Sequence, residues 1–156
     1  MNWKALKFMS LPVLLIAMTR LMFCTTPSCL EETQSLVKAT FYKNRTDSIK
    51  APDTLTVFGL GRDTSKIYDK SPHLSAVQIP LDVSAGTCGF VFILDGITDT
   101  LTLSYTSYPH LISKECGYSF YHILDSYTVT GRTIDTIMFM NKSITTTNEE
   151  NIRIFY

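Results

Sequence analysis

No cluster of basic side chains occurs in this sequence, and its formal net charge is zero. Three basic residues, Lys4, Lys7 and Arg20, fall within the first 24 residues, which contain no acidic residue. Removing these three from the 14 basic residues leaves 11 against 14 acidic ones, a net charge of −3 for the rest of the chain. Proteins that bind nucleic acids carry basic patches that neutralise phosphates, so this charge pattern argues against a nucleic-acid partner.

The sequence also lacks the short motifs of common catalytic and metal sites. Its three histidines, His73, His110 and His122, are far apart and show neither His-x-His nor His-x₃-His spacing. No Gly-x-Ser-x-Gly elbow is present, and Gly59-Leu60-Gly61 lacks the third glycine of a dinucleotide-binding loop. We therefore predict no catalytic residue, no metal site, no cofactor and a function other than catalysis.

Three aspartates could still assemble a calcium or acid/base site in the folded chain. These are Asp95, Asp99 and Asp125. The turn-forming tendency of aspartate explains each of them without a shared site, and we expect them to lie in turns.

No apolar run reaches the roughly 20 residues that a membrane-spanning helix needs. The longest candidate, residues 8–18, follows Lys4 and Lys7 and contains Pro12. A positive region before a short apolar run is typical of a secretion signal, whereas proline argues against an ordinary helix there. We predict a signal peptide at residues 1–23, an anchor and tether at 24–34, and a single domain at 35–156.

Two cysteines, Cys24 and Cys29, closely follow the apolar run, as the acylated cysteine of a bacterial lipoprotein does. Such signals place a small residue directly before the cysteine and an aliphatic residue three positions before it. Cys24 has Leu21 but also the bulky Phe23, and Cys29 has the small Ser28 but no aliphatic residue at the other position. We predict lipid attachment at Cys24, with Cys29 as the alternative; a secreted protein without lipid is the other interpretation. Acylation holds a protein at a membrane because each buried methylene contributes about 0.8 kcal/mol.

From residue 35 onward, apolar and polar residues alternate with a period of two, which is typical of half-buried strands. About eight such strands with no convincing helix indicate an antiparallel sandwich or barrel, and we predict an all-β antiparallel β-sandwich. The expected strands are 37–41, 54–57, 77–81, 88–94, 100–105, 118–129, 134–140 and 152–156.

The proline positions and the strand patterns predict further details of the sheets. Pro80 places its strand at an edge or a bulge, and Pro109 should end the strand that precedes it. The stretch from Cys88 to Leu94 is apolar at both parities and should be a central strand. Residues 69–73 are expected to form a loop.

Two more local signals concern turns and bulges. Asp95-Gly96 is a hairpin turn signal. In the expected strand 118–129, the apolar residues change parity after Asp125-Ser126. Such a change implies a bulge or bend, because a one-residue slip exchanges the two faces of a strand.

Several short motifs follow one another along the chain: Cys29-Leu30-Glu31 with Thr33, Leu36, Phe41-Tyr42, Gly59-Leu60-Gly61, Pro80-Leu81, Asp99-Thr100-Leu101-Thr102, Ser113-Lys114-Glu115-Cys116-Gly117-Tyr118, Ile134-Asp135 and Ile152-Arg153-Ile154-Phe155. Their order resembles a family of small uncharacterised lipoproteins of Bacteroidetes, a domain of unknown function. The resemblance implies a cell-envelope location, periplasmic or surface-exposed, and a β fold, but no activity.

The resemblance also bears on the cysteines. It implies that a lipidated cysteine precedes Cys29, which makes Cys24 the anchor, and that Cys29 forms a disulfide with Cys116. The number of cysteines allows an alternative: if Cys29 carries the lipid, Cys88 pairs with Cys116. Either disulfide fits export to an oxidising compartment.

Aromatic residues gather around residues 105–127. Exposed tyrosines could stack on sugars or form a hot spot for a protein, although strands are rich in aromatic residues for packing alone. The candidate binding residues are Tyr105, Tyr108 and Tyr121. We predict a non-catalytic, lipid-anchored envelope protein that binds or scaffolds an envelope protein or glycan. The alternatives are a carbohydrate-binding module that uses these tyrosines and a small hydrolase whose histidine meets a carboxylate.

Overall fold

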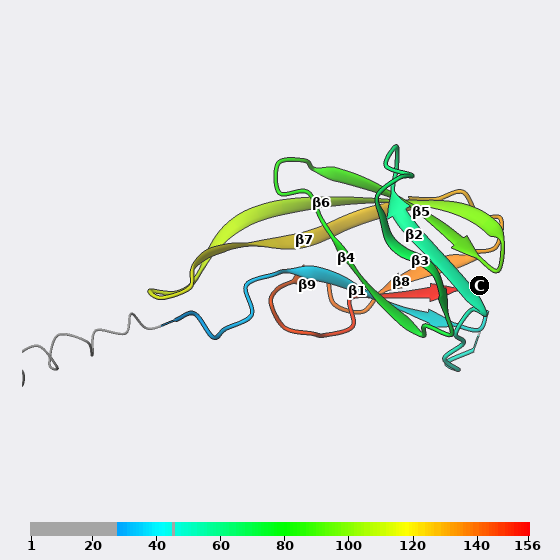
Figure 1. Cartoon of the computed structure of the whole chain (residues 1–156), viewed down its shortest axis with the longest axis horizontal. Coiled ribbons are helices and arrows are strands. Elements are labelled where there is room, and N and C mark those ends of the chain that lie inside the picture. Colours follow the sequence, from blue (N-terminus) through cyan, green and yellow to red (C-terminus); the bar gives the residue numbers. More distant parts are fainter. Residues whose placement is uncertain (1–27, 45) are drawn as a thin grey trace, which may run out of the picture. The chain divides into compact units, whose positions relative to one another are not determined.

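The computed structural model describes residues 28–44 and 46–156, and within these residues all regular structure is β-strand (Figure 1). Two sheets of six and four strands pack together. The predicted all-β sandwich is therefore confirmed, with ten strands in place of about eight. They are β1 (Leu36–Tyr42), β2 (Thr54–Gly59), β3 (Lys66–Pro72), β4 (Ala76–Pro80), β5 (Thr87–Leu94), β6 (Ile97–Ser113), β7 (Gly117–Val129), β8 (Thr136–Phe139), β9 (Ser143–Ile144) and β10 (Ile152–Phe155).

The smaller sheet has the order β4-β1-β10-β8 and the larger one β3-β2-β5-β6-β7-β9. All pairs are antiparallel except one: β1 and β10, from opposite ends of the domain, run parallel, with Ala39 opposite Ile152. This pair departs from the predicted antiparallel arrangement. Its long separation in the chain leaves no local sequence signal for it.

The core lies between the sheets, where the period-two patterns direct alternate side chains inward. On β6, Leu101, Leu103 and Tyr105 are 0–3 % exposed. The rings of Phe41 on β1 and Phe92 on β5 meet edge to face across the two sheets, with centroids 6.3 Å apart. The predicted alternation of β1 and β6 is confirmed.

Four finer predictions are also confirmed. β4 is an edge strand that ends at Pro80, and β5 is central, between β2 and β6. Asp95 and Gly96 have φ angles of 50° and 84° and join β5 to β6, as a two-residue turn with both central residues at positive φ requires. On β7 the register skips Asp125, because Tyr105 pairs with Leu124 and Ser104 pairs with Ser126.

Two expectations about the strands are wrong. Residues 69–73 were expected to form a loop, but most of them belong to β3, a polar edge strand that is held by backbone pairing with β2 rather than by apolar alternation. Pro109 does not end β6, which continues to Ser113. β5 pairs with β6 only as far as Ser104, so Pro109 lies where one edge of β6 has no neighbouring strand, and prolines are tolerated at such edges.

The predicted signal peptide at 1–23 and lipid attachment at Cys24 lie outside the described residues. None of the described residues belongs to a helix of the length and apolarity needed to span a bilayer. Residues 31–156 form one compact unit.

Candidate binding surface on the β6–β7 ribbon

β6 and β7 continue as a pair beyond the strands that flank them (Figure 1). β5 accompanies β6 only as far as Ser104, and β9 pairs with β7 only at His122 and Ile123. We call residues 106–123 the ribbon. A two-stranded ribbon has few neighbours that could bury its side chains, so the apolar ones remain accessible.

Residues directly opposite each other in an antiparallel pair project from the same face. One face, the inner face, continues the core surface outward from Tyr105 and Leu124. The opposite face is the outer face. The inner face carries the pairs Ser107–His122, Pro109–Phe120 and Leu111–Tyr118, and the outer face carries Thr106–Ile123, Tyr108–Tyr121 and His110–Ser119.

Both faces of the ribbon expose large apolar side chains. Tyr118 is 72 % exposed, Leu111 is 48 % exposed and Phe120 is 42 % exposed on the inner face. On the outer face, Ile123 is 42 % exposed and Tyr108 is 37 % exposed. A contiguous set of exposed apolar residues usually marks a surface for interaction.

Of the three candidate tyrosines, only Tyr108 and Tyr121 lie together on the ribbon. Tyr105 is buried at 3 % exposure, and its hydroxyl donates a hydrogen bond to the carbonyl of Asp82 at 2.7 Å. Tyr108 and Tyr121 lie together on the outer face, with rings 6.1 Å apart at 78°. His110 stacks on Tyr121 at 4.2 Å and 16°. Burial therefore removes Tyr105 from any binding surface, and the two remaining tyrosines are not coplanar.

The base of the inner face contains a buried histidine. His122 is 2 % exposed, its Nδ1 lies 2.8 Å from Ser107 Oγ, and its ring meets Tyr105 edge to face at 5.5 Å. Burial lowers the pKa of His122. Its parity on β7 is readable from the sequence, but its partner Ser107 depends on the register of β6 and β7.

The other two histidines, His73 and His110, are exposed. His73 Nδ1 lies 4.0 Å from Asp53 Oδ1, and both side chains are largely exposed. His110 takes part in the aromatic stack. Within residues 28–44 and 46–156, no group of three or more histidine, cysteine, aspartate or glutamate side chains could hold a metal ion.

The chain segment that leads into β1 lies along β7. Ser119 Oγ donates a hydrogen bond to the carbonyl of Thr33, and Ser35 Oγ donates one to the carbonyl of Phe120 at 2.6 Å. A groove of about 380 Å³ lies beside these contacts. Its apolar and ring-bearing lining comes from Leu36, Pro80, Leu81, Val83, Tyr118, Phe120 and His122. The sequence did not predict these contacts, because neither Ser35 nor Ser119 belongs to a recognisable motif.

Two of the described cysteines, Cys29 and Cys116, are disulfide-bonded, and Cys88 is a free thiol. The alternative bond between Cys88 and Cys116 is therefore not the one in this structure. The pairing of Cys29 with Cys116 stays a prediction. Burial raises the pKa of the Cys88 thiol.

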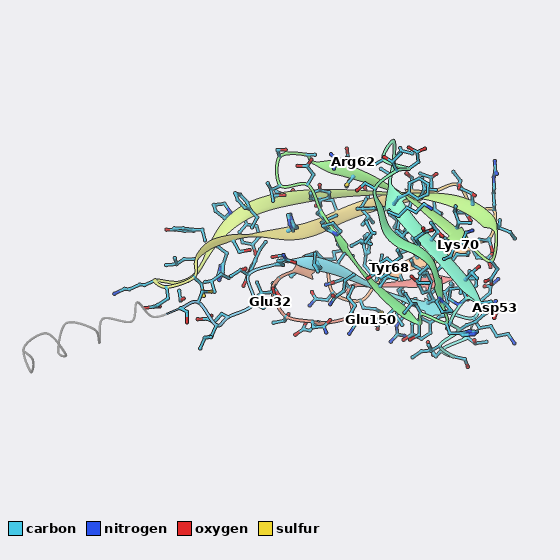
Figure 2. All side chains as sticks on the ribbon, viewed as in Figure 1. Glu32, Asp53, Arg62, Tyr68, Lys70 and Glu150 are labelled. Carbon is cyan, nitrogen blue, oxygen red and sulfur yellow. The ribbon has the colours of Figure 1, made fainter. Side chains whose placement is uncertain are left out.

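The free thiol lines a separate cavity of about 500 Å³ at the β2–β3 connection, where Arg62 is labelled in Figure 2. Arg62 and Ser65 share this cavity with Cys88. A raised pKa favours the protonated thiol of Cys88, which is a weaker nucleophile than the thiolate.

The three aspartates do not form a shared site. Asp95 accepts a hydrogen bond from the amide of Thr54, and Asp125 accepts one from Thr106 Oγ1 at 3.2 Å. The turn interpretation is wrong for Asp125, which lies in β7, and for Asp99, which lies in β6. The buried carboxylate of Asp99 accepts hydrogen bonds from Thr130 Oγ1 and from three amides of the loop after β7, those of Arg132, Thr133 and Ile134.

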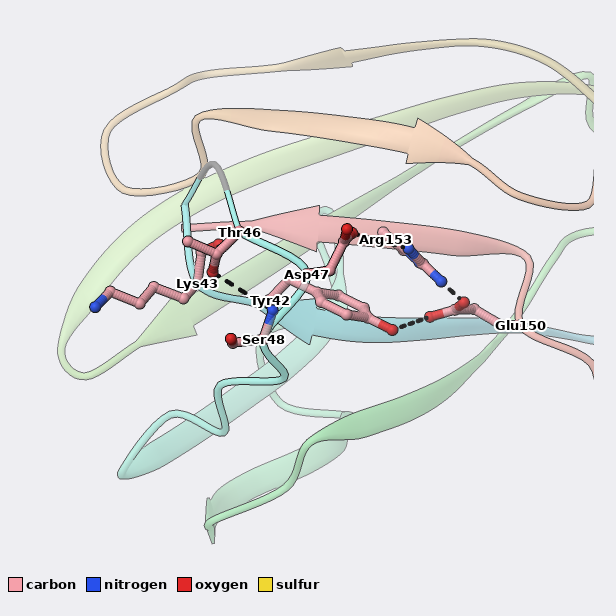
Figure 3. Close-up of polar contacts among 7 residues, drawn as sticks. All are labelled: Tyr42, Lys43, Thr46, Asp47, Ser48, Glu150 and Arg153. Carbon is pink, nitrogen blue, oxygen red and sulfur yellow. Dashed lines mark hydrogen bonds and ion pairs between the residues drawn. The ribbon is translucent and has the colours of Figure 1, made fainter.

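A second polar cluster lies on the smaller sheet (Figure 3). Glu150 accepts hydrogen bonds from the Tyr42 hydroxyl at 3.2 Å and from Arg153 Nε at 3.0 Å. The Arg153 guanidinium lies 4.7 Å from the centre of the Tyr42 ring and forms an ion pair with Asp47 at 3.4 Å. Because the cluster joins Tyr42 of β1 to Arg153 of β10 through Glu150, it is best explained as a contact that holds these two strands together.

Comparison with known proteins gives one family match: the model of a family of unknown function matches residues 54–156. No curated protein matches the chain, and no solved structure matches it. The comparisons therefore leave the function to be argued from the ribbon and its surroundings.

Proposed function

The chain belongs to DUF6452, a family of unknown function, and from its own structure we propose a non-catalytic, lipid-anchored protein of the cell envelope. In this proposal the protein binds or scaffolds a partner through the ribbon. The observation that carries the proposal is the set of exposed apolar side chains on a part of β6 and β7 that the other strands leave uncovered, Tyr118 above all at 72 % exposure.

The cysteines support an envelope location. Cys29 and Cys116 are disulfide-bonded, and structural disulfides persist mainly in oxidising compartments outside the cytosol. The order of motifs resembles the small lipoproteins of Bacteroidetes, and Cys24 follows a short apolar run that is preceded by positive residues. Together these features favour export followed by acylation, at the periplasmic or the outer surface of the envelope.

The placement of the histidines supports a role other than catalysis. His122, the buried one, faces Ser107 rather than a carboxylate. His73 is close to Asp53, but that pair is exposed to solvent and lies in none of the described cavities. A general acid or base needs a tuned pKa and a partner in a site that holds substrate, and neither histidine combines the two.

A carbohydrate-binding module is the second candidate, and the outer face of the ribbon is the observation that favours it. His110 and Tyr121 stack there, with Tyr108 beside them. Sugar stacking uses open, flat aromatic faces, whereas here one face of Tyr121 is already covered by His110. The geometry therefore supports this candidate less well than a surface for a protein or a membrane.

Lipid attachment is tested by metabolic labelling with fatty acid and by intact mass of protein purified from membranes. We expect the wild-type chain and the Cys29→Ala and Cys88→Ala variants to carry acyl chains, and the Cys24→Ala variant to carry none. Acylation that survives in both the Cys24→Ala and Cys29→Ala variants, or a wild-type mass without lipid, would show that the anchor is not where we place it.

A further inference from the structure

The distribution of the exposed apolar residues on the ribbon says what kind of partner fits it. Leu111, Tyr118 and Phe120 project from the inner face, and Tyr108 and Ile123 project from the outer face. A folded protein that docked on one face would leave the other face in water. A medium that surrounds the ribbon covers both faces.

The backbone of the ribbon limits how deeply it could enter such a medium. Beyond Ser104, the edge of β6 that faces away from β7 has no partner strand among the described residues. Unpaired amide and carbonyl groups cannot enter the hydrocarbon core of a bilayer without a large cost. They can remain in the headgroup region, where water reaches them and where tyrosine side chains are enriched.

Few residues separate the proposed anchor from the segment that contacts the ribbon. Thr33 and Ser35 are hydrogen-bonded to β7 at Ser119 and Phe120. Cys24 precedes Thr33 by nine residues, and nine extended residues span at most about 30 Å. An acyl chain on Cys24 would thus hold this part of β7 within about 30 Å of the bilayer surface.

The turn at the end of the ribbon has no net charge that would oppose contact with a membrane. It carries one basic and one acidic residue, Lys114 and Glu115, so its formal charge is balanced. Attraction to anionic lipids is therefore not required, and zwitterionic lipids should suffice.

We propose that the ribbon lies in the lipid–water interface of the membrane that carries the anchor. The exposed side chains of both faces lie in the headgroup and upper acyl region: Leu111, Tyr118 and Phe120 from the inner face, and Tyr108 and Ile123 from the outer face. This inference rests on the proposed function for the anchor that brings the ribbon to the bilayer. It adds a second, non-covalent membrane contact and fixes which end of the sandwich faces the bilayer.

The test compares variants that each carry a single tryptophan, either in the ribbon or at the far end of β6. Trp3 is the only tryptophan of the sequence, so it is changed to phenylalanine in every variant. Tyr118→Trp and Leu111→Trp report on paired positions of the ribbon. Ile97→Trp is the matched control, because Ile97 is 49 % exposed and lies about 45 Å of strand away from Leu111.

Each full-chain variant is purified from membranes of a bacterial host and placed in vesicles of phosphatidylcholine and phosphatidylethanolamine, with and without brominated acyl chains. We expect bromine to reduce the fluorescence of Tyr118→Trp and Leu111→Trp by roughly half, since interfacial side chains lie about 5–10 Å deep. Ile97→Trp should change little.

Three outcomes would overturn the inference. Quenching of Ile97→Trp equal to that of both ribbon variants means no preferred contact, and absence of quenching in both ribbon variants means no contact. A blue shift that depends on protein concentration and not on lipid means that a second copy covers the ribbon. Intact mass of the same samples tests the anchor separately: acylated protein without ribbon quenching defeats the inference alone, and ribbon quenching without acylation defeats the proposed anchor alone.

Discussion

The carboxylate of Asp99 connects the beginning of β6 to the loop that follows β7. It is fully buried and accepts four hydrogen bonds, three of them from consecutive loop amides. Burial raises the pKa of Asp99, but the hydrogen bonds lower it by more, so that the pKa lies below its usual value. The ionised form is therefore the one that stabilises the fold.

Replacing this carboxylate with an amide should destabilise the domain. In Asp99→Asn, an NH₂ group must face backbone amides that need an acceptor, and we expect a loss of about 2–4 kcal/mol in the free energy of unfolding. Urea unfolding at pH 7 measures it. Asp125→Asn is the control, because Asp125 is exposed and accepts a single side-chain hydrogen bond, and it should cost under about 0.5 kcal/mol.

The effect of Asp99→Asn should also depend on pH. The pKa of Asp99 is depressed in the folded state, so its contribution is present above the unfolded pKa of about 4 and is lost as pH falls through the folded pKa. The gap between wild type and variant should then shrink in acid. A gap that is the same at pH 7 and in strong acid would contradict the assigned role.

The burial of His122 predicts a second pH dependence, which arises from a basic group rather than an acidic one. Burial lowers its pKa in the folded state, whereas the unfolded chain takes up a proton below about pH 6.5. Stability should thus decrease as pH falls from about 6.5 toward the folded pKa. Unfolding free energies measured from pH 7.5 to 5 should show this slope for the wild type and a smaller one for His122→Gln. His73→Gln, which alters an exposed ring, should keep the wild-type slope, and a His122→Gln slope equal to the wild-type one would reject the prediction.

At the scale of the element, the bulge at Asp125 decides which side chains of β7 face the core. Before it, His122 and Leu124 point inward, and after it the inward positions pass to Tyr127 and Val129. One extra residue therefore lets a single strand serve the sandwich and the ribbon with the correct face in each.

Deleting Asp125 tests this role separately from the chemistry of its side chain. The deletion removes the extra residue, so one half of β7 must turn its apolar set outward, and we expect a loss of at least about 3 kcal/mol or failure to fold. Asp125→Ala keeps the chain length and should cost less than about 1 kcal/mol. Both are compared by thermal unfolding and by soluble yield. Similar stabilities for the two variants would show that the strand does not need the bulge.

At the scale of the whole molecule, the parallel pair of β1 and β10 joins the two ends of the described domain. β10 then pairs with β8, so the smaller sheet is assembled from segments at both ends of the sequence. Contacts of such long range close slowly during folding. A disulfide near the start of the domain constrains the unfolded chain and thereby stabilises the folded state.

The disulfide is the link that can be tested. We expect non-reducing peptide mapping to recover Cys29 joined to Cys116, and Cys116→Ser to lower the free energy of unfolding by about 2–5 kcal/mol. Cys88→Ser is the control, because Cys88 is a free thiol, and it should leave stability nearly unchanged. Recovery of Cys116 joined to Cys24 or to Cys88 would show that the predicted pairing is wrong.

Features that depend on near neighbours along the chain could be predicted from the sequence. Period-two alternation predicted most strands and their inward positions, Asp95-Gly96 predicted the hairpin turn, and the change of parity after Asp125 predicted the bulge. These signals are local because a strand turns successive side chains to opposite faces wherever it lies.

Which of those strand positions are buried by other segments depends on the tertiary structure. Leu124, His122 and Phe120 share one face of β7, but Leu124 and His122 are buried whereas Phe120 is 42 % exposed on the ribbon. The place of β1 beside β10 and the burial of Asp99 are of the same kind. Alternation tells which side chains share a face, whereas coverage of that face depends on segments that are distant in the chain, and a single sequence carries no local pattern for them.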